Sequence, residues 1–296
     1  MNNNDLGGNM NNQIGFVGYG NLGKAMIQRL SEKDISLLLW NRSKDVFQDV
    51  SLPIAQTLSS LGKECTTIFL NVYDSKAVRE ILIELLPHCK SGHIIIDTTT
   101  NHFEEVLNFY SMCKERKVEY VEAPVLGSVI PASKGALTTL VSGQEETYEK
   151  IRPLLSVLSR HIYFLSKPGL ASKMKLINNL CLGSFMTTLA EALHLGESVG
   201  IDKSKVLEIL SNGGGDSLVL RAKKPSLEQE DFTAQFSNSC MKKDLNLVTE
   251  LSQKLNHTLF TADAAKNLYT ALCNNNMEEE DFSSIYRYIK KMNPIE

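Results

Sequence analysis

The chain has 296 residues, of which 43% are apolar and 22% charged, and its formal net charge is −3 at pH 7. This length exceeds the usual size of a single domain, so we expect two domains with a large buried core. The charge balance and the lack of Lys/Arg clusters argue against a nucleic-acid-binding or membrane-surface protein. No apolar run is long enough to span a bilayer, and residues 1–12, rich in Asn and Gly, are expected to form a flexible tail.

Cysteine and histidine spacing limits the chemistry further. The six cysteines contain no CxxC pair, a pattern typical of reduced thiols in a cytoplasmic protein. The six histidines do not cluster, so the sequence predicts no metal site.

The first motif is a glycine-rich turn between a strand and a helix. An apolar strand at 13–17 runs into Gly18-Tyr19-Gly20-Asn21-Leu22-Gly23, and a helical pattern follows at 24–33. In a dinucleotide-binding turn, one glycine makes the tight bend, one admits a pyrophosphate and one lets the helix pack closely on the strand. The phosphates then lie at the helix N-terminus, which favours anions. The alternative is a glycine-rich turn that binds nothing.

The end of the second strand indicates which dinucleotide binds. The strand at 35–40 is followed by Asn41-Arg42-Ser43, whereas an NAD-binding domain usually has a carboxylate there that binds the ribose hydroxyls. An amide, a guanidinium and a hydroxyl suit a 2′-phosphate, so we predict NADP. The alternative is an exposed loop arginine.

Strands and helices continue to alternate, which predicts a doubly wound α/β domain over 13–168. The expected strands are 66–71, 93–96, 118–121, 137–142 and 162–165, and the expected helices are 75–86, 103–117 and 145–158. Ligands gather at the carboxyl ends of such strands. There, Asn71-Val72 would lie along the cofactor, and Thr98–Thr100 would offer hydroxyls or cap the next helix. Gly127 and Ser128 would offer backbone N–H groups to a small carboxylate or form only a turn.

Residues 169–200 predict one long helix, about 45 Å at 1.5 Å per residue. Apolar residues lie all round it, so we expect it to be buried between two domains or two subunits, which favours a dimer. Near its start, Lys175, Asn178 and Asn179 share one side. They either meet a ligand or partners, or this first part of the helix is exposed to water.

After the long helix the pattern is helical throughout, which predicts an all-helical domain over 201–296. The helical blocks lie near 202–211, 217–223, 238–256, 261–273 and 282–291, separated by glycine, proline and asparagine breaks.

In their order along the chain, the motifs resemble those of the β-hydroxyacid dehydrogenases, relatives of 3-hydroxyisobutyrate and 6-phosphogluconate dehydrogenases. The resemblance covers about residues 14–288. The glycine turn is the first signature, and Asp97-Thr98-Thr99-Thr100 with Ala123-Pro124-Val125-Leu126-Gly127 is the second. The third runs from Gly169 to Lys175 and on to Asn178-Asn179, and the fourth is Lys243-Asp244-Leu245. The family fold pairs a Rossmann domain with a long interdomain helix and an all-helical domain.

The resemblance implies roles for individual residues. Lys175 is similar to the family's catalytic lysine, and Asn179 to its usual partner. Thr100, Lys243 and Asp244 resemble residues at the nicotinamide end of the cofactor. Thr99 and Asn178 are implied substrate contacts, and Phe236 is expected to shape the pocket. A small carboxylate-bearing aldehyde of the glyoxylate or succinic semialdehyde type is the implied substrate, reduced to a hydroxyacid with NADP(H).

Three positions depart from the family pattern. Ala171 replaces a glycine of the third signature, Thr99 replaces a serine, and Leu126 replaces a serine that is common in the substrate loop. The last change makes the pocket less polar, so it bears on the substrate more than on the chemistry.

Two other functions remain open from the sequence. An imine reductase shares this fold, but Lys175 argues against it because such enzymes usually carry another residue there. A catalytically inactive oligomerisation scaffold is the second; family members joined to chromatin proteins resemble one and have lost the lysine. A homodimer or homotetramer is expected from the apolar long helix.

Overall fold

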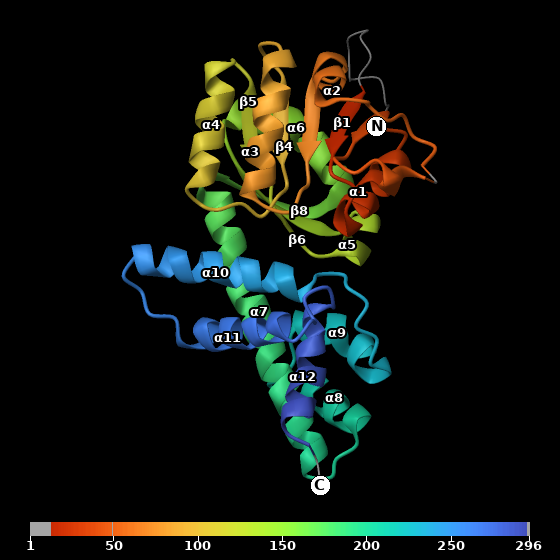
Figure 1. Ribbon diagram of the computed structural model, residues 1–296, viewed down its shortest axis with the longest axis vertical. Coiled ribbons are helices and arrows are strands. Elements are labelled where there is room, and N and C mark those ends of the chain that lie inside the picture. The colour runs from red at the N-terminus through yellow and green to blue at the C-terminus, as the bar shows by residue number, and fades with distance from the viewer. Residues whose placement is uncertain (1–12, 49, 295–296) are drawn as a thin grey trace. The chain divides into compact units, whose positions relative to one another are not determined.

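The computed structural model describes residues 13–48 and 50–294 (Figure 1). The predicted tail at residues 1–12 lies outside them. The chain divides into two compact units, the first ending at Lys175 and the second beginning at Leu176. This division falls within one long helix, α7 (Leu170–Ser198). The domain boundaries expected near residues 168 and 200 remain predictions.

The first unit is built on an eight-stranded sheet in the order β2-β1-β3-β4-β5-β7-β6, with β8 paired to β7. Its strands are β1 (Ile14–Val17), β2 (Leu37–Trp40), β3 (Thr67–Leu70), β4 (Ile94–Asp97), β5 (Glu119–Glu122), β6 (Val125–Leu126), β7 (Leu137–Ser142) and β8 (Ser159–Ser166). Strands β1 to β5 pair in parallel, whereas β7 is antiparallel to β5 and β6. The chain crosses from β2 back over β1 to form β3. The carboxyl ends of β1 and β3 therefore border the crevice where ligands bind in such sheets.

Helices cover both faces of this sheet. They are α1 (Asn21–Ser31), α2 (Leu58–Glu64), α3 (Ser75–Leu85), α4 (Glu105–Glu115), α5 (Val129–Ser133) and α6 (Glu145–Leu158), with 3-10 turns η1 (Asp45–Phe47) and η2 (Leu86–His88). Neighbouring residues of one strand lie in opposite cores because side chains alternate along a strand. Phe16 and Phe69 belong to the core under α1 and α6, and Val17 and Ile68 to the core under α2 to α4. Burial on both faces explains why these strands are short continuous apolar runs.

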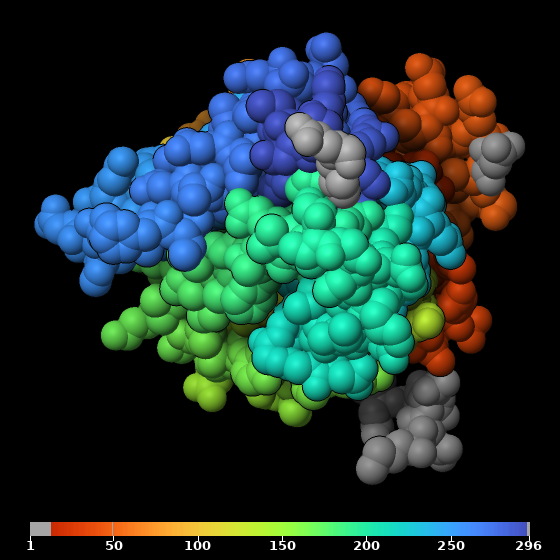
Figure 2. Space-filling model, turned by 90° about the horizontal axis from the view of Figure 1, so that it is seen from below, coloured from red at the N-terminus to blue at the C-terminus, as the bar shows by residue number. Residues whose placement is uncertain are grey.

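The second unit is helical, as predicted. After α7 come α8 (Lys203–Ser211), α9 (Leu218–Gln229), α10 (Asn238–Lys254), α11 (Phe260–Asn274), the 3-10 turn η3 (Phe282–Ser284) and α12 (Ile285–Met292). Their shared core includes Met186, Leu245, Tyr269 and Tyr286, each fully buried. Helices α10 and α11 form a hairpin whose connecting loop projects from the rest of the unit (Figure 2). Within the described residues, we find no helix that combines the length and apolar character needed to cross a bilayer.

The predicted fold class is confirmed, and the differences are local. Helix α2 was not predicted, because its seven residues are too few to show a clear period. It is nevertheless well defined, because the Thr57 side chain accepts a hydrogen bond from the Ser60 amide at 3.1 Å and the Thr57 amide donates to the Ser60 hydroxyl oxygen at 3.3 Å. The five-residue helix α5 was missed for the same reason.

One predicted break was wrong. Pro225 was expected to separate two helical blocks, but it lies inside α9, which continues to Gln229. A proline in a helix loses one backbone hydrogen bond, and buried side chains on both sides of it, Leu220 and Leu227, hold the helix in the core.

Candidate active site

The glycine-rich turn connects β1 to α1, and its glycines differ in what surrounds them. A Cβ on Gly18, whose φ is +108°, would lie 2.0 Å from the Asn71 carbonyl oxygen, and one on Gly23 would lie 2.6 Å from that of Gly18. A Cβ on Gly20 would meet no atom within 4 Å. Two glycines thus allow close backbone packing, while the third leaves open space at the start of α1.

The start of α1 suits an anion. Its N-cap is Gly20, which has no side chain to bond the first amides, and its first turn holds no acidic residue. The N–H groups at a helix start and the helix dipole both favour a phosphate at such a position. The open side of Gly20 and this helix start together fit the pyrophosphate of a dinucleotide.

The segment after β2 packs beside this turn. The side-chain oxygen Oδ1 of Asn41 accepts a hydrogen bond from the Tyr19 backbone amide at 3.1 Å, and its side-chain nitrogen Nδ2 donates to the Ser43 carbonyl at 2.9 Å. Arg42 is exposed, and its guanidinium lies 3.0 Å from the Glu80 carboxylate on α3. The structure therefore places the three predicted residues next to the glycine turn, with the arginine already facing a carboxylate.

The ends of β3 and β4 are locked to each other. The Asn71 side chain donates to the Thr98 hydroxyl at 2.8 Å, and the Val72 amide donates to the Thr99 hydroxyl oxygen at 3.1 Å. The threonine run does not cap the next helix, because α4 has Glu104 at its N-cap. That alternative is wrong. The role of Thr99 as a substrate contact remains a prediction, and its hydroxyl oxygen is already occupied by an amide.

Asp97, for which the sequence predicted no role, organises this turn. Its carboxylate is buried and accepts hydrogen bonds from the Thr99 amide at 2.9 Å, the Asn101 side chain at 2.7 Å and the Tyr120 hydroxyl at 2.6 Å. Burial raises the pKa of Asp97, and the hydrogen bonds from Tyr120, Thr99 and Asn101 oppose that shift.

The loop after β6 needs its glycine. Gly127 has φ +115°, and a Cβ there would lie 2.9 Å from the Leu137 side chain. Ser128 is the N-cap of α5 and accepts a hydrogen bond from the Val129 amide at 2.7 Å. The positive φ favours glycine at this position.

Lys175 is buried, with 9% of its surface exposed, and its Nζ donates to the Val125 carbonyl oxygen at 2.8 Å. It therefore lies against the residue two positions before Gly127, in the first unit. The exposed-helix alternative is wrong for this lysine.

Asn178 and Asn179 belong to a polar chain in the second unit. The fully buried Asn179 donates to the Asp244 carboxylate at 2.6 Å and accepts from Asn178 at 3.0 Å. Lys243 lies 2.8 Å from the other oxygen of Asp244. The structure thus brings together four predicted site residues. Lys175 and Asn179 lie four residues apart on α7, so their side chains share one face of that helix.

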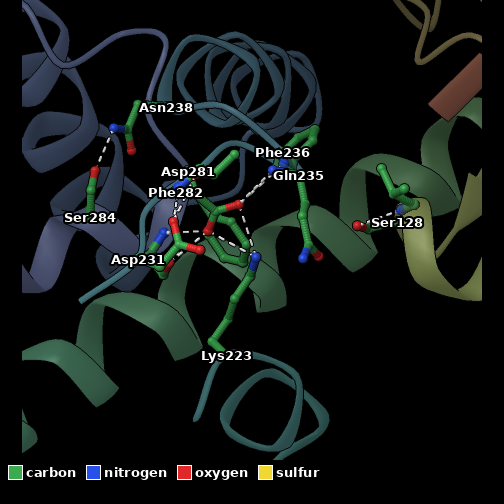
Figure 3. A network of polar contacts seen from close by, with 12 residues as sticks. Ser128, Lys223, Asp231, Gln235, Phe236, Asn238, Asp281, Phe282 and Ser284 are labelled. Carbon is green, nitrogen blue, oxygen red and sulfur yellow. Dashed lines mark hydrogen bonds and ion pairs between the residues drawn. The ribbon is translucent and has the colours of Figure 1, made fainter. Parts of the chain in front are cut away.

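Phe236 lies in the segment between α9 and α10, within a network that sequence reasoning missed (Figure 3). Its centre is the buried Asp281, which accepts hydrogen bonds from the Gln235 and Phe236 amides at 3.0 and 3.2 Å. Lys223 lies 2.8 Å from the same carboxylate. No local pattern signals this pair, because its members are 58 residues apart.

Comparison with known proteins shows the family to which the chain belongs. Residues 13–166 match the family model described as the NAD binding domain of 6-phosphogluconate dehydrogenase. Residues 169–289 match the one described as the NAD-binding of NADP-dependent 3-hydroxyisobutyrate dehydrogenase. Both matched models describe the NAD(P)-binding parts of dehydrogenases. The chain belongs to the β-hydroxyacid dehydrogenase family, as its motifs predicted.

Several relatives cover nearly the whole chain. Cytokine-like nuclear factor N-PAC of Gallus gallus is 28% identical over 281 residues, which are 93% of this chain and 51% of the relative. The chain thus spans about half the length of this relative. The 2-(hydroxymethyl)glutarate dehydrogenase of Eubacterium barkeri is 28% identical and covers 96% of both chains. Glyoxylate/succinic semialdehyde reductase 2, chloroplastic, of Arabidopsis thaliana is 26% identical over 94% of this chain and 79% of its own.

A solved structure supports the fold. The 3-hydroxyisobutyrate dehydrogenase of Salmonella typhimurium superposes with a TM-score of 0.86 and 21% identity, over 93% of this chain and 99% of that one.

Proposed function

We propose that this protein uses NADP(H) to reduce a small carboxylate-bearing aldehyde to a hydroxyacid, or catalyses the reverse, with Lys175 as the acid/base. The observation that carries the proposal is the position of the Lys175 amine, which is buried and bonded to the Val125 carbonyl at 2.8 Å. A lysine is rarely buried without a structural or chemical reason.

The Val125 carbonyl suits a lysine that changes its protonation state. A carbonyl oxygen accepts a hydrogen bond from an ammonium and from a neutral amine alike. Lys175 can therefore stay in place while it gives a proton to the substrate oxygen during reduction, or takes one during oxidation.

The chain has a suitable cradle for the cofactor. We assign the pyrophosphate to the turn Gly18–Gly23 and the start of α1, where a Cβ on Gly20 would fill the open space. Asn71, Val72 and Thr100 would lie along the cofactor, with Lys243 and Asp244 at the nicotinamide end. When bound, the nicotinamide supplies or accepts the hydride.

We assign the 2′-phosphate of NADP to Asn41, Arg42 and Ser43. Support comes from the lack of a carboxylate among these three residues and from the exposed guanidinium, 69% of whose side chain is open to solvent. Thr99, Gly127, Ser128, Asn178 and Phe236 are the proposed substrate contacts. The similarity to the reductase of Arabidopsis thaliana supports an aldehyde of that type.

The test separates chemistry from binding. Lys175→Ala is expected to lower turnover at least about 100-fold while NADPH affinity stays within about threefold of wild type, because the proton donor is lost and the cradle is not. The assay uses a panel of four aldehydes: glyoxylate, succinic semialdehyde, tartronate semialdehyde and methylmalonate semialdehyde. Lys173→Ala, two residues earlier on the same helix, is the control and should keep its activity. Turnover of Lys175→Ala within a few-fold of wild type would rule out this role.

An inactive scaffold is the second candidate, because the chain also matches about half of N-PAC, a relative named as a nuclear factor and not as a dehydrogenase. It predicts that NADPH binds without turnover of any aldehyde in the panel. It also predicts that the Lys175→Ala variant behaves like the wild type in every assay.

We also propose that the protein forms a homodimer or homotetramer through α7. One face of this helix is apolar and exposed, with Met174 (38%), Ile177 (49%), Phe185 (50%) and Leu195 (65%). At 3.6 residues per turn these positions fall on one face of the helix, which can pack against the same face of a second copy. Leu195→Asp should convert the protein to a monomer in light scattering, and an unchanged mass would exclude this interface.

We also propose a cytoplasmic location, because the cysteine pattern predicts reduced thiols.

A further inference from the structure

Helix α7 begins against the sheet, and its first amides bond to side chains of two strands. The Gly169 and Ser172 amides donate to the Glu122 carboxylate, the latter at 2.9 Å, and the Ala171 amide donates to the Ser142 hydroxyl at 3.0 Å. The Leu170 amide donates to the Lys167 carbonyl at 3.2 Å. The amides at a helix start usually bond to water or to a local cap. Here residues at the ends of β5 and β7 take that place.

Glu122 is matched to this position in charge and in hydrogen bonding. It is 1% exposed, and it also accepts a hydrogen bond from the Ser172 hydroxyl at 2.7 Å. A buried carboxylate is costly unless donors surround it, and the positive end of a helix is where its charge is favoured. The sequence separation from Gly169 is 47 residues, so no local motif reveals the contact.

The same segment of chain also holds the Lys175 amine. Lys175 lies three residues after Ser172 on α7, and Val125, whose carbonyl it contacts at 2.8 Å, lies three residues after Glu122. Residues 122–125 therefore contact the helix at its first amides and again at the lysine. The end of β7 is held in turn by the Tyr110 hydroxyl, which donates to the Ser142 carbonyl at 2.7 Å.

We infer that Glu122, assisted by Ser142, is a positioning residue that fixes the Lys175 amine against the edge of the sheet. This rests on the proposed acid/base role of Lys175. Displacement of a reacting group by about 1 Å costs on the order of 100-fold in rate. The carboxylate therefore acts on turnover through the helix, without touching the substrate.

The main variant is Glu122→Gln, which keeps the shape but removes the charge and one acceptor. We expect kcat to fall about 10- to 100-fold, with KM and the Kd for NADPH within about threefold of wild type. Ser142→Ala, which removes a single acceptor, should lower kcat about three- to tenfold. Glu119→Gln, at the exposed start of β5, is the matched control and should leave kcat unchanged.

A second measurement reports on the amine itself. Lys175 is labelled with pyridoxal phosphate and borohydride and quantified by peptide mass spectrometry. Glu122→Gln and Ser142→Ala should change its labelling rate, and Glu119→Gln should not. If Glu122 only caps the helix, its variant should have a lower melting temperature with kcat and the Lys175 labelling rate unchanged. That result would overturn the inference. If Glu122→Gln does not fold, the same two readouts on Ser142→Ala decide.

The outcomes separate this inference from the proposed function. An inactive Lys175→Ala together with a fully active Glu122→Gln overturns the positioning role alone. A fully active Lys175→Ala overturns the acid/base role on which it rests.

Discussion

The Arg42 guanidinium lies 3.0 Å from the Glu80 carboxylate, beside the glycine turn. Both side chains are at least half exposed, at 69% and 50%. Exposed pairs of this kind contribute only about 0–1 kcal/mol, so a phosphate can displace the carboxylate. Glu80 is thus a weak internal competitor for the group to which we assign the 2′-phosphate of NADP.

This competition makes cofactor preference adjustable in both directions. Arg42→Ala should weaken NADPH binding about 10- to 100-fold and NADH binding less than about twofold, because the bidentate contact serves the extra phosphate. Glu80→Gln should tighten NADPH binding about two- to fivefold. It removes the negative charge that competes with the phosphate for Arg42, an interaction worth up to about 1 kcal/mol. Dissociation constants from fluorescence titration test both.

Glu84→Gln is the control for Glu80, because it lies on the exposed side of the same helix, one turn further on. Equal losses for NADPH and NADH in Arg42→Ala would exclude the 2′-phosphate assignment. Tighter NADPH binding in Glu84→Gln would show that the effect is one of overall charge.

The glycine turn predicts opposite outcomes for two neighbouring glycines. Gly18→Ala should destabilise the fold by about 2–4 kcal/mol, because its Cβ would lie 2.0 Å from the Asn71 carbonyl at φ +108°. Gly20→Ala should change stability by less than about 1 kcal/mol yet weaken NADPH binding at least tenfold, because its Cβ enters open space. Urea unfolding and NADPH titration separate the two effects. Unimpaired NADPH binding by Gly20→Ala would place the pyrophosphate elsewhere.

The sequence was sufficient for the architecture because that information is local. Alternating apolar strands, the glycine turn and the long helix each occupy one continuous stretch, and the predicted Rossmann and helical parts are confirmed. The short helices α2 and α5 were missed, since too few residues repeat to show a period.

The candidate site was predicted less completely, because its contacts join distant parts of the chain. Lys175 was expected at the site, but its bond to the Val125 carbonyl spans 50 residues and left no sequence signal. The same holds for Glu122 with Ser172 and for Lys223 with Asp281. Buried polar pairs are specified by the folded arrangement, so spacing alone does not reveal them.

The Lys223–Asp281 pair should matter to the stability of the second unit. Its side chains are only 7% and 2% exposed, and removing one partner of a buried pair typically costs about 3–5 kcal/mol. Lys223→Met should cost less than Asp281→Asn, because Asp281 keeps donors from Gln235, Phe236 and Ser283, whereas an asparagine amide would face those donors. Urea unfolding measures both, and Lys224→Met, the next residue on α9, is the control. Equal stability of Lys223→Met and wild type would show that the pair contributes nothing.

His93 predicts a dependence of stability on pH. The residue precedes β4, is 5% exposed, and its Nδ1 has no hydrogen-bond partner among the described residues. Burial, with a smaller contribution from the charge of Lys90, lowers the pKa of His93 below its ordinary value of 6.5. Between the lowered pKa and 6.5, the unfolded chain binds a proton that the folded chain does not, so stability rises with pH. The contribution is complete above about pH 6.5 and is lost as the pH falls towards the lowered value.

Urea unfolding of wild type should therefore show stability decreasing from pH 7 to pH 5, and His93→Gln should reduce that slope. His161→Gln, at an exposed position on β8, should keep the wild-type slope. Identical slopes for His93→Gln and wild type would mean that this buried imidazole does not contribute to the pH dependence.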